Sequence, residues 1–396
     1  MNSLATGDER KERRVKIIGN VLIISILLVT VELSSYLALR FGLLPKLPAL
    51  FYITPPAMNE PLYNLHMQYR HPVVGWATDL PEEKRYSVEI ESRPNPTFPN
   101  EDNSCVSIYG DSFTFGDEVN DDEAWGNVLS GLLECKVANY GQSGYGTDQA
   151  YLRFELNAAA DKAPVNLLAI YPDNILRNLN QYRPFLAGPY ASWLAVKPRF
   201  IVEGEELKLI PQPSFTYDEL VKASTTPELL FKHETFIPGS ANGLPRYSFP
   251  YSLTIARFIT SKKVRNYLSK TPSWIHYLEE DHPSDGLKIV SGIIGKFAAL
   301  SEQRGQRPVL VLYPTASSYR YFKSTGISAT QAIADEARNL GIPYLDLHEP
   351  FAQHLGERNY CELLTMPESC AGHYNPEGNR AVASLINEIL EPMIGG

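Results

Sequence analysis

A serine, a histidine and several glycines stand at positions from which they could carry out acyl transfer. Ser112 lies in the stretch 110–116 (GDSFTFG), directly after the apolar run 105–109. That run predicts a buried parallel strand, and residues 125–133 after it have a helical pattern. A serine between a strand and a helix exposes its hydroxyl at the carboxyl end of a sheet, beside backbone N–H groups that bind anions. By itself the stretch fits a plain turn equally well.

Two later blocks favour chemistry over a turn. A second short strand, 136–138, is followed by Asn139 and the turn that contains Gly141, Gly144 and Gly146. Near the C-terminus His373 begins the stretch HYNPEGNR, which opens a final helix. A serine hydroxyl is a poor nucleophile at neutral pH and needs a nearby base such as an imidazole.

These blocks, in this order, resemble the SGNH/GDSL hydrolase family, and specifically its membrane-anchored bacterial members. The resemblance covers roughly residues 106–389, with weaker support from residues 71–76. It implies that Ser112 attacks an ester carbonyl and that His373 takes the proton. It also implies an oxyanion hole built from the backbone N–H groups of Ser112 and Gly144.

The third oxyanion donor departs from the family pattern. The family has Asn-Asp after its third strand, whereas this chain has Asp173 followed by Asn174. Position by position the donor falls on Asp173, whose carboxylate would repel the developing oxyanion unless it were protonated. A shift of one residue gives the role to Asn174, which we favour.

The residue at the position of the acid that orients the base also departs from the family pattern. The family carries an aspartate three residues before the histidine, and here that residue is Cys370. Glu368 is a candidate substitute, as is a backbone carbonyl, and a Ser–His dyad without an acid is workable. Asp111 is expected to hold the serine loop through backbone hydrogen bonds. The remaining histidines are interpreted as structural: His66, His71, His233, His276, His282, His348 and His354.

The composition of the chain limits the classes of partner that it could bind. The chain has 396 residues, a net charge of -9 and a pI near 5.5, and basic residues cluster only at its N-terminus. These features argue against nucleic acid, and no zinc-type Cys/His spacing occurs. We therefore expect no metal and no cofactor. The 23 Tyr and 4 Trp are compatible with a sugar-binding cleft or with ordinary packing.

The N-terminus predicts a membrane anchor. Five basic residues between 10 and 16 precede an apolar run, 17–39, which as a helix would span about 35 Å. The basic flank places the N-terminus in the cytoplasm and the rest outside it, in the periplasm or at the cell surface. Glu32 either faces a partner helix or marks the end of the span. A cleaved signal peptide is the alternative, although the run is long and lacks a clear cleavage site.

An extracytoplasmic location allows disulfides. Cys105 and Cys135 begin two strands that should be neighbours, and Cys361 and Cys370 flank a short loop before His373. We predict these two pairs from the three pairings that four cysteines allow. Four buried free thiols are the alternative.

The alternation of strand and helix patterns predicts an α/β fold, a parallel five-stranded sheet with helices on both faces (SGNH/flavodoxin-like). Strands are expected near 105–109, 135–139, 165–171, 308–313 and 342–346, and helices near 123–133, 147–160, 285–304, 329–340 and 377–390. The expected divisions are a cytoplasmic tail (1–16), a transmembrane helix (17–39), a Pro-rich and irregular stalk (40–100) and an SGNH hydrolase-like domain (101–396). An insertion after the third strand, 179–284, contains a predicted hairpin over 198–211. The insertion either caps the active-site end of the sheet or is a structural elaboration of the fold.

Two function classes follow. The first is a serine-dependent esterase or O-acyltransferase acting on an extracytoplasmic acylated carbohydrate or another small ester, a substrate class that the resemblance supplies. The second is a catalytically silent SGNH-like protein that binds glycan or scaffolds an assembly, suggested by the departures at Asp173 and Cys370. Esterase and transferase share one acyl-enzyme intermediate, so the sequence does not separate them.

Overall fold

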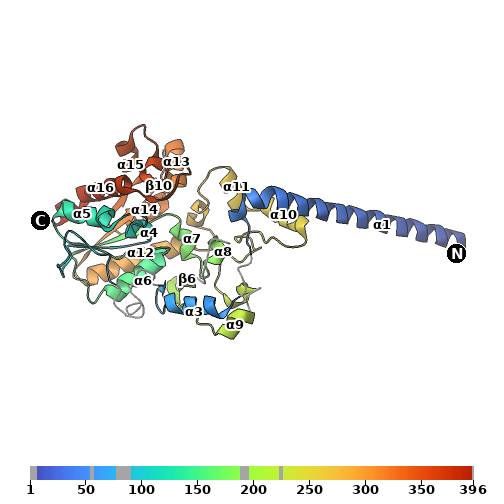
Figure 1. The fold of residues 1–396 in the computed structure, drawn as a ribbon, viewed down its shortest axis with the longest axis horizontal. Helices are drawn as coiled ribbons and strands as arrows, with labels where there is room; N and C mark the ends of the chain where they lie inside the picture. The colour runs from blue at the N-terminus through green and yellow to red at the C-terminus, as the bar shows by residue number, and fades with distance from the viewer. Residues whose placement is uncertain (1–6, 54–57, 77–90, 188–195, 223–225, 395–396) are drawn as a thin grey trace.

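The computed structural model describes residues 7–53, 58–76, 91–187, 196–222 and 226–394. Figure 1 shows an α/β domain at one end and a long N-terminal helix, α1, that projects from the other. Helices α10 and α11 lie between the two. The chain therefore has an elongated shape with its two termini far apart.

A parallel sheet of five strands forms the centre of the domain, in the order β4-β3-β5-β8-β9. The strands are β3 (Val106–Tyr109), β4 (Val137–Asn139), β5 (Val165–Ile170), β8 (Arg307–Leu312) and β9 (Tyr344–Asp346). All neighbouring pairs in this sheet are parallel. The predicted fold class and the positions of all five strands are confirmed.

The sheet is covered on both faces, as its continuous apolar strands require. In β5, Leu168 and Ile170 pack into a cluster that includes residues of α6, α12 and α14. The alternate residues Leu167 and Ala169 pack into a second cluster with residues of α5, α15 and α16. Side chains of a strand point to opposite faces in turn, so every residue of β5 is buried. Figure 1 shows α6 and α12 on one side of the sheet and α5, α15 and α16 on the other.

The helices around this core have the following bounds: α4 (Ser112–Phe115), α5 (Trp125–Leu133), α6 (Thr147–Asn157), α7 (Asn174–Asn178), α12 (Gly286–Gln303), α13 (Ala316–Thr325), α14 (Gln331–Asn339), α15 (His348–Leu355) and α16 (Pro376–Ile394). The sequence predicts five of them and misses α4, α7, α13 and α15. A small antiparallel pair, β10 (Leu364–Met366) and β11 (Ala371–Tyr374), precedes α16.

The strand order places a switch point at β3. The chain passes from β3 to β4 on one side and then crosses to β5 on the other side of β3. In open parallel sheets, ligands bind beyond the carboxyl ends of the strands at such a point. Ser112 follows β3 and therefore lies where the topology opens a crevice.

The insertion between α7 and α12 is fixed to the domain by buried polar groups. It contains α8 (Pro184–Ala187), β6 (Arg199–Glu203), β7 (Glu206–Ile210), α9 (Tyr217–Lys222), α10 (Tyr251–Thr260) and α11 (Lys262–Leu268). Within the insertion, the buried Glu234 carboxylate accepts hydrogen bonds from the backbone N–H groups of Gln181 (2.8 Å) and Tyr182 (3.1 Å). Lys197 forms a buried ion pair with Asp148 of α6. The predicted hairpin is β6–β7, which turns at Gly204 with a φ of 68°.

The segment expected to be an irregular stalk is more ordered than its prolines suggest. It holds α3 (Glu60–Tyr69) and the short strands β1 (Arg70–His71) and β2 (Gly75–Trp76). The Trp76 indole N–H donates to the Ser143 carbonyl (3.0 Å), and the Tyr145 hydroxyl donates to the Trp76 carbonyl (2.8 Å). This segment thus packs on the turn after β4. The prolines at 55, 56 and 81 lie outside the described residues.

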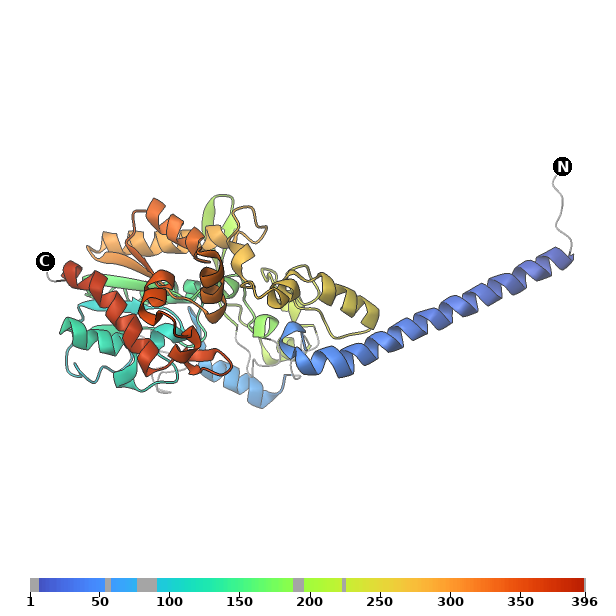
Figure 2. The ribbon, with the colours of Figure 1, turned by 90° about the horizontal axis from the view of Figure 1, so that it is seen from above.

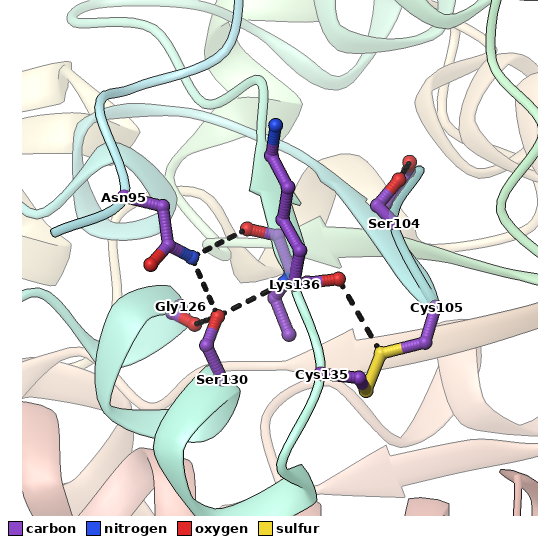
Figure 3. The surroundings of a disulfide bond; sticks show 9 residues. Asn95, Ser104, Cys105, Gly126, Ser130, Cys135 and Lys136 are labelled. Carbon is purple, nitrogen blue, oxygen red and sulfur yellow. Dashed lines mark hydrogen bonds between the residues drawn. A yellow bond between two sulfur atoms is a disulfide. The ribbon is translucent and has the colours of Figure 1, made fainter. Parts of the chain in front are cut away.

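Both predicted cysteine pairs lie at disulfide distance. Cys105 and Cys135 are bonded with their Cα atoms 6.0 Å apart, and Cys361 and Cys370 with theirs 4.7 Å apart. Figure 3 shows the first disulfide where β3 and β4 begin, next to the hydrogen bond from Asn95 to the Ser130 hydroxyl (2.7 Å). The second ties residue 361 to the turn that precedes His373. Two such bonds fit a protein of an oxidising compartment.

Helix α1 (Gly7–Leu37) is long and apolar enough to cross a membrane, and it continues through a π-helical segment, Ala38–Leu43. Its side chains between residues 17 and 33 are almost all exposed. The sequence left open whether Glu32 faces a partner helix or marks the end of the span. In the structure Glu32 contacts a helix, α10, of the same chain. The Glu32 carboxylate accepts the backbone N–H of Tyr251, the first residue of α10, at 2.6 Å.

Candidate active site

Ser112 is the first residue of α4, at the carboxyl end of β3. The Asp111 carboxylate caps α4 by accepting the backbone N–H of Phe113 at 3.0 Å. Position 110 has to be glycine, since a Cβ there would collide with the Thr114 side chain. The turn ends at Gly116, whose φ of 84° lies in the left-handed region. These local features set Ser112 at the carboxyl edge of the sheet, with 5% of the residue exposed.

His373 lies against this turn. It belongs to β11, and its ring centroid is 4.8 Å from the ring centroid of Phe113, the residue after the serine. Phe113 also stacks on Tyr171 at 4.1 Å, so the aromatic contacts join the ends of β3 and β5 to the histidine. Ser112 and His373, 261 positions apart in the sequence, thus come from neighbouring segments of one site.

Glu118 is the carboxylate at the Nδ1 side of His373. Its Oε1 lies 3.3 Å from His373 Nδ1, an ion-pair distance without hydrogen-bond alignment. Its Oε2 accepts the His373 backbone N–H at 3.2 Å and the Thr365 hydroxyl. The Thr365 hydroxyl, together with that N–H, lowers the pKa of Glu118 below its ordinary value and keeps it ionised. A φ of 70° puts Glu118 in the left-handed region, a strained backbone that is common at functional sites.

Glu368, the acid suggested by the sequence, lies elsewhere. It is exposed in the turn between β10 and β11. The pairing of Met366 with Ala371 closes this turn, so the carboxyl is carried to the tip of the hairpin while His373 remains on its body. Cys370, at the position of the family's aspartate, is held in the disulfide with Cys361. The structure therefore brings Glu118, and not Glu368, to the imidazole.

Asp117 approaches the other ring nitrogen. Its Oδ2 lies 3.9 Å from His373 Nε2, and the Ser143 hydroxyl donates to its Oδ1 at 2.7 Å. Burial raises the pKa of the Asp117 carboxyl above its ordinary value. The Ser143 contact also connects the serine loop to the turn that contains Gly144. The sequence analysis missed both acids, and the signal was the pair Asp117-Glu118 directly after the glycine that ends α4.

The two candidates for the third oxyanion donor differ in surroundings. Asn174 begins α7, is 1% exposed, and its side chain interacts with the Asp111 carboxyl beside the serine. Its Oδ1 is buried without a hydrogen-bond partner. Asp173 instead lines a cavity of about 510 Å³ together with Lys263 and Arg320. Burial raises the pKa of Asp173.

Gly144 and Arg177 organise the turn after β4. Gly144 has a φ of 78°, and its carbonyl accepts a hydrogen bond from Arg183 at 3.1 Å. Arg177 of α7 donates to the Tyr145 carbonyl at 2.7 Å and lies 3.3 Å from Asp111 Oδ2. Burial raises the pKa of Asp111, and the Arg177 guanidinium opposes that rise. Arg177, which the sequence analysis left unassigned, therefore joins the ends of β3, β4 and β5.

A second Ser–His–Asp array lies away from this site. His348 Nε2 is 2.8 Å from Ser318 Oγ, and His348 Nδ1 is 2.6 Å from Asp346 Oδ1. Ser318 is fully buried and its hydroxyl accepts the Thr315 N–H (2.7 Å) within the cap of α13. An ester cannot reach a hydroxyl that is enclosed on all sides. The array joins α13 to the end of β9, in agreement with the structural role expected for His348.

Across the described parts of the chain, no cluster of three or more His, Cys, Asp or Glu side chains is arranged to hold a metal ion. The sequence matches no protein-family model and no curated protein. Solved structures give weak matches that cover about three quarters of the chain.

The similar structures include a lipolytic protein of the G-D-S-L family and two esterases. One is a putative lipolytic protein of the G-D-S-L family from Desulfitobacterium hafniense, with 15% identity, a TM-score of 0.36, and coverage of 73% of this chain and 100% of that one. Another is an acetyl-xylooligosaccharide esterase from Geobacillus, with 11% identity, a TM-score of 0.38, and coverage of 74% and 94%. A third is the esterase EstA from Pseudoalteromonas, with 10% identity, a TM-score of 0.35, and coverage of 75% and 100%. The roles of individual residues therefore rest on this chain's own geometry.

Replacing Glu118 by glutamine should lower turnover of an acetyl ester such as p-nitrophenyl acetate by up to about 10⁴-fold, because the ring loses the charge that fixes its orientation and tautomer. Glu368→Gln is the matched control and should leave turnover unchanged. Steady-state kinetics of the full chain in detergent would measure both. A loss of turnover in Glu368→Gln alone would assign the orienting role to Glu368 in place of Glu118.

Proposed function

We propose that this chain is a serine-dependent acyl ester hydrolase or O-acyltransferase of the SGNH/GDSL type. The observation that carries the proposal is the contact of His373 with the strand-to-helix turn of Ser112, with Glu118 at the Nδ1 side of the ring. This set supplies a nucleophile, a base and an orienting acid. The solved structures that resemble the chain are of the same type.

In the proposed reaction, Ser112 Oγ attacks the ester carbonyl while His373 takes the hydroxyl proton. The tetrahedral intermediate collapses, the alcohol leaves with that proton, and the acyl group remains on Ser112. Water or an acceptor hydroxyl then attacks, with His373 again accepting the proton, and the serine is regenerated. Glu118 stabilises the imidazolium formed in each half of the reaction.

The proposed oxyanion hole consists of the backbone N–H groups of Ser112 and Gly144 and the side-chain amide of Asn174. Asn174 is supported as the third donor because its buried side chain lies beside Asp111, next to the nucleophile. Asp173 lines the cavity that Lys263 also lines, and Arg177 and then Lys263 oppose the rise in its pKa that burial causes. In this proposal the inverted order gives the donor role to the amide and leaves the carboxylate outside the oxyanion hole.

The proposed substrate is an acylated carbohydrate outside the cytoplasm. The resemblance to membrane-anchored SGNH proteins supplies this class, and the candidate span and the two disulfides fit it. The proposed topology has the N-terminus in the cytoplasm, the bilayer at residues 17–39 and the catalytic domain in the periplasm or at the cell surface. The division into tail, span, lead-in and domain with insertion 179–284 belongs to the same proposal.

A catalytically silent glycan-binding or scaffold protein is the second candidate. The observation that favours it is the disulfide of Cys370, which occupies the position of the family's acid. Its discriminating property is binding of glycan with no ester turnover that depends on Ser112.

Two serine variants distinguish the proposed nucleophile, Ser112, from Ser318 of the buried Ser–His–Asp array. Ser112→Ala should reduce acetyl-ester hydrolysis to the uncatalysed background, because it removes the proposed nucleophile. Ser318→Ala should retain turnover but lose about 1–3 kcal/mol of unfolding free energy, because the buried His348 nitrogen loses its partner. Kinetics and urea unfolding of the full chain would measure these effects, and activity unchanged in Ser112→Ala would refute the enzyme proposal at this site.

The donor assignment has its own test. Asn174→Ala should lower kcat by about 10²–10³-fold with little change in KM, because in the proposal the amide contacts the substrate only when the oxyanion develops. Asp173→Asn, which alters the neighbouring residue, should have a mild effect. A rise in kcat for Asp173→Asn with a neutral Asn174→Ala would instead place Asp173 in the hole.

A further inference from the structure

Helix α10 lies along α1 at a depth where a transmembrane helix would be surrounded by lipid. Tyr251 and Ser252, at the start of α10, donate backbone N–H groups to Glu32 at 2.6 and 3.3 Å. Further along, Phe258 packs in one apolar cluster with Leu39 of the π-helical segment. Two contacts seven residues apart on each segment mean that the helices run side by side in the same direction. Figures 1 and 2 both show α10 beside the domain-proximal part of α1.

The depth follows from helix geometry. Arg40, the first basic residue after the apolar run, follows Glu32 by eight positions. Glu32 therefore lies about 12 Å from Arg40 along the helix axis, toward the middle of the apolar run. A leaflet contributes about half of the roughly 30 Å hydrocarbon core. If residues 17–39 span the bilayer, as proposed above, the beginning of α10 is inside the leaflet on the domain's side.

The polar groups at this depth satisfy one another. A lone carboxylate in a membrane is costly, and so are the unpaired N–H groups at the start of a helix. Here the Glu32 carboxylate accepts both N–H groups and also the Ser252 hydroxyl. This pairing removes the main obstacle to placing the N-terminus of α10 in hydrocarbon, where backbone groups have to be satisfied internally.

The large exposed side chains at the start of this segment are apolar, and the exposed polar residues of α10, Arg257 and Thr260, lie near its end. Phe249 is 70% exposed and Leu253 is 44% exposed, and Ile259 is also exposed. Leu33 and Leu37 of α1, which lie at the same depth along the helix axis, are also exposed. The surface is continuous with that of the candidate span, so whatever surrounds α1 also reaches α10.

We infer that α10 and the preceding residues 247–250 form a half-membrane anchor whose exposed face contacts the lipid acyl chains of the leaflet next to the domain. The partner is therefore lipid. Because α11 continues directly from α10 and its Lys263 and Tyr267 line the cavity beside Asp173, this anchor fixes the height of that cavity above the membrane.

Depth-dependent fluorescence quenching tests the inference. All four native cysteines are disulfide-bonded, so single cysteines introduced as F249C and L253C can be labelled selectively with an NBD fluorophore in the full chain. In phosphatidylcholine nanodiscs, both labels should show blue-shifted emission and quenching by lipid nitroxides on the acyl chain. L132C is the matched control, because Leu132 of α5 is 46% exposed and Figure 1 places α5 at the far end of the domain; its label should remain unquenched.

L27C, in the middle of α1, reports on the span itself. Quenching at residue 27 without quenching at residues 249 and 253 would overturn the half-membrane anchor while leaving the transmembrane proposal standing. No quenching at residue 27 would overturn both. A blue shift at residue 253 without lipid quenching would mean that a second copy or another protein covers the face, and would also reject lipid as the partner. None of these readouts depends on ester turnover.

Discussion

The site depends on the sharp turn by which β3 becomes α4. The buried Asp111 carboxylate holds it by accepting the Phe113 N–H, and Arg177 attaches the same carboxylate to the turn after β4 and the start of α7. One carboxylate thus fixes the ends of three strands at the switch point of the sheet. Since a misplacement of about 1 Å can cost about 10²-fold in rate, this rigidity is what a reactive serine would need.

The imidazole has an unusual set of neighbours. Carboxylates of two consecutive residues, Asp117 and Glu118, lie near its two nitrogens at 3.9 and 3.3 Å. They differ in environment, because burial raises the pKa of Asp117 while hydrogen bonds lower that of Glu118. The carboxylate on the Nδ1 side therefore keeps its negative charge more readily, and the carboxyl on the Nε2 side is more easily protonated. The disulfide of Cys370 holds the hairpin that presents His373 to both acids.

The sequence was sufficient wherever local patterns decide the structure. Continuous apolar runs predicted the five strands, and the glycine-rich turn predicted where Ser112 would lie. Contacts between distant segments could not be predicted in this way. Glu118 reaches the His373 N–H across 255 positions, and Glu32 reaches Tyr251 across 219. Glu368 is closer to the histidine in sequence, but the hairpin turns it outward. Prolines made residues 40–100 resemble an irregular stalk, although α3 forms once Asn59 caps it by accepting the Leu62 N–H at 2.9 Å.

The central claim is that Ser112 is a nucleophile activated by His373. Its most direct test is labelling of the full chain with a fluorophosphonate, from which the activated serine displaces fluoride to form a stable Ser–O–P bond, followed by mass spectrometry of the peptides. The account predicts one adduct, on Ser112, that is lost in His373→Ala, with Ser318 unlabelled. A folded protein that hydrolyses an acetyl ester yet carries no adduct on Ser112, or that is labelled equally well without His373, would contradict it.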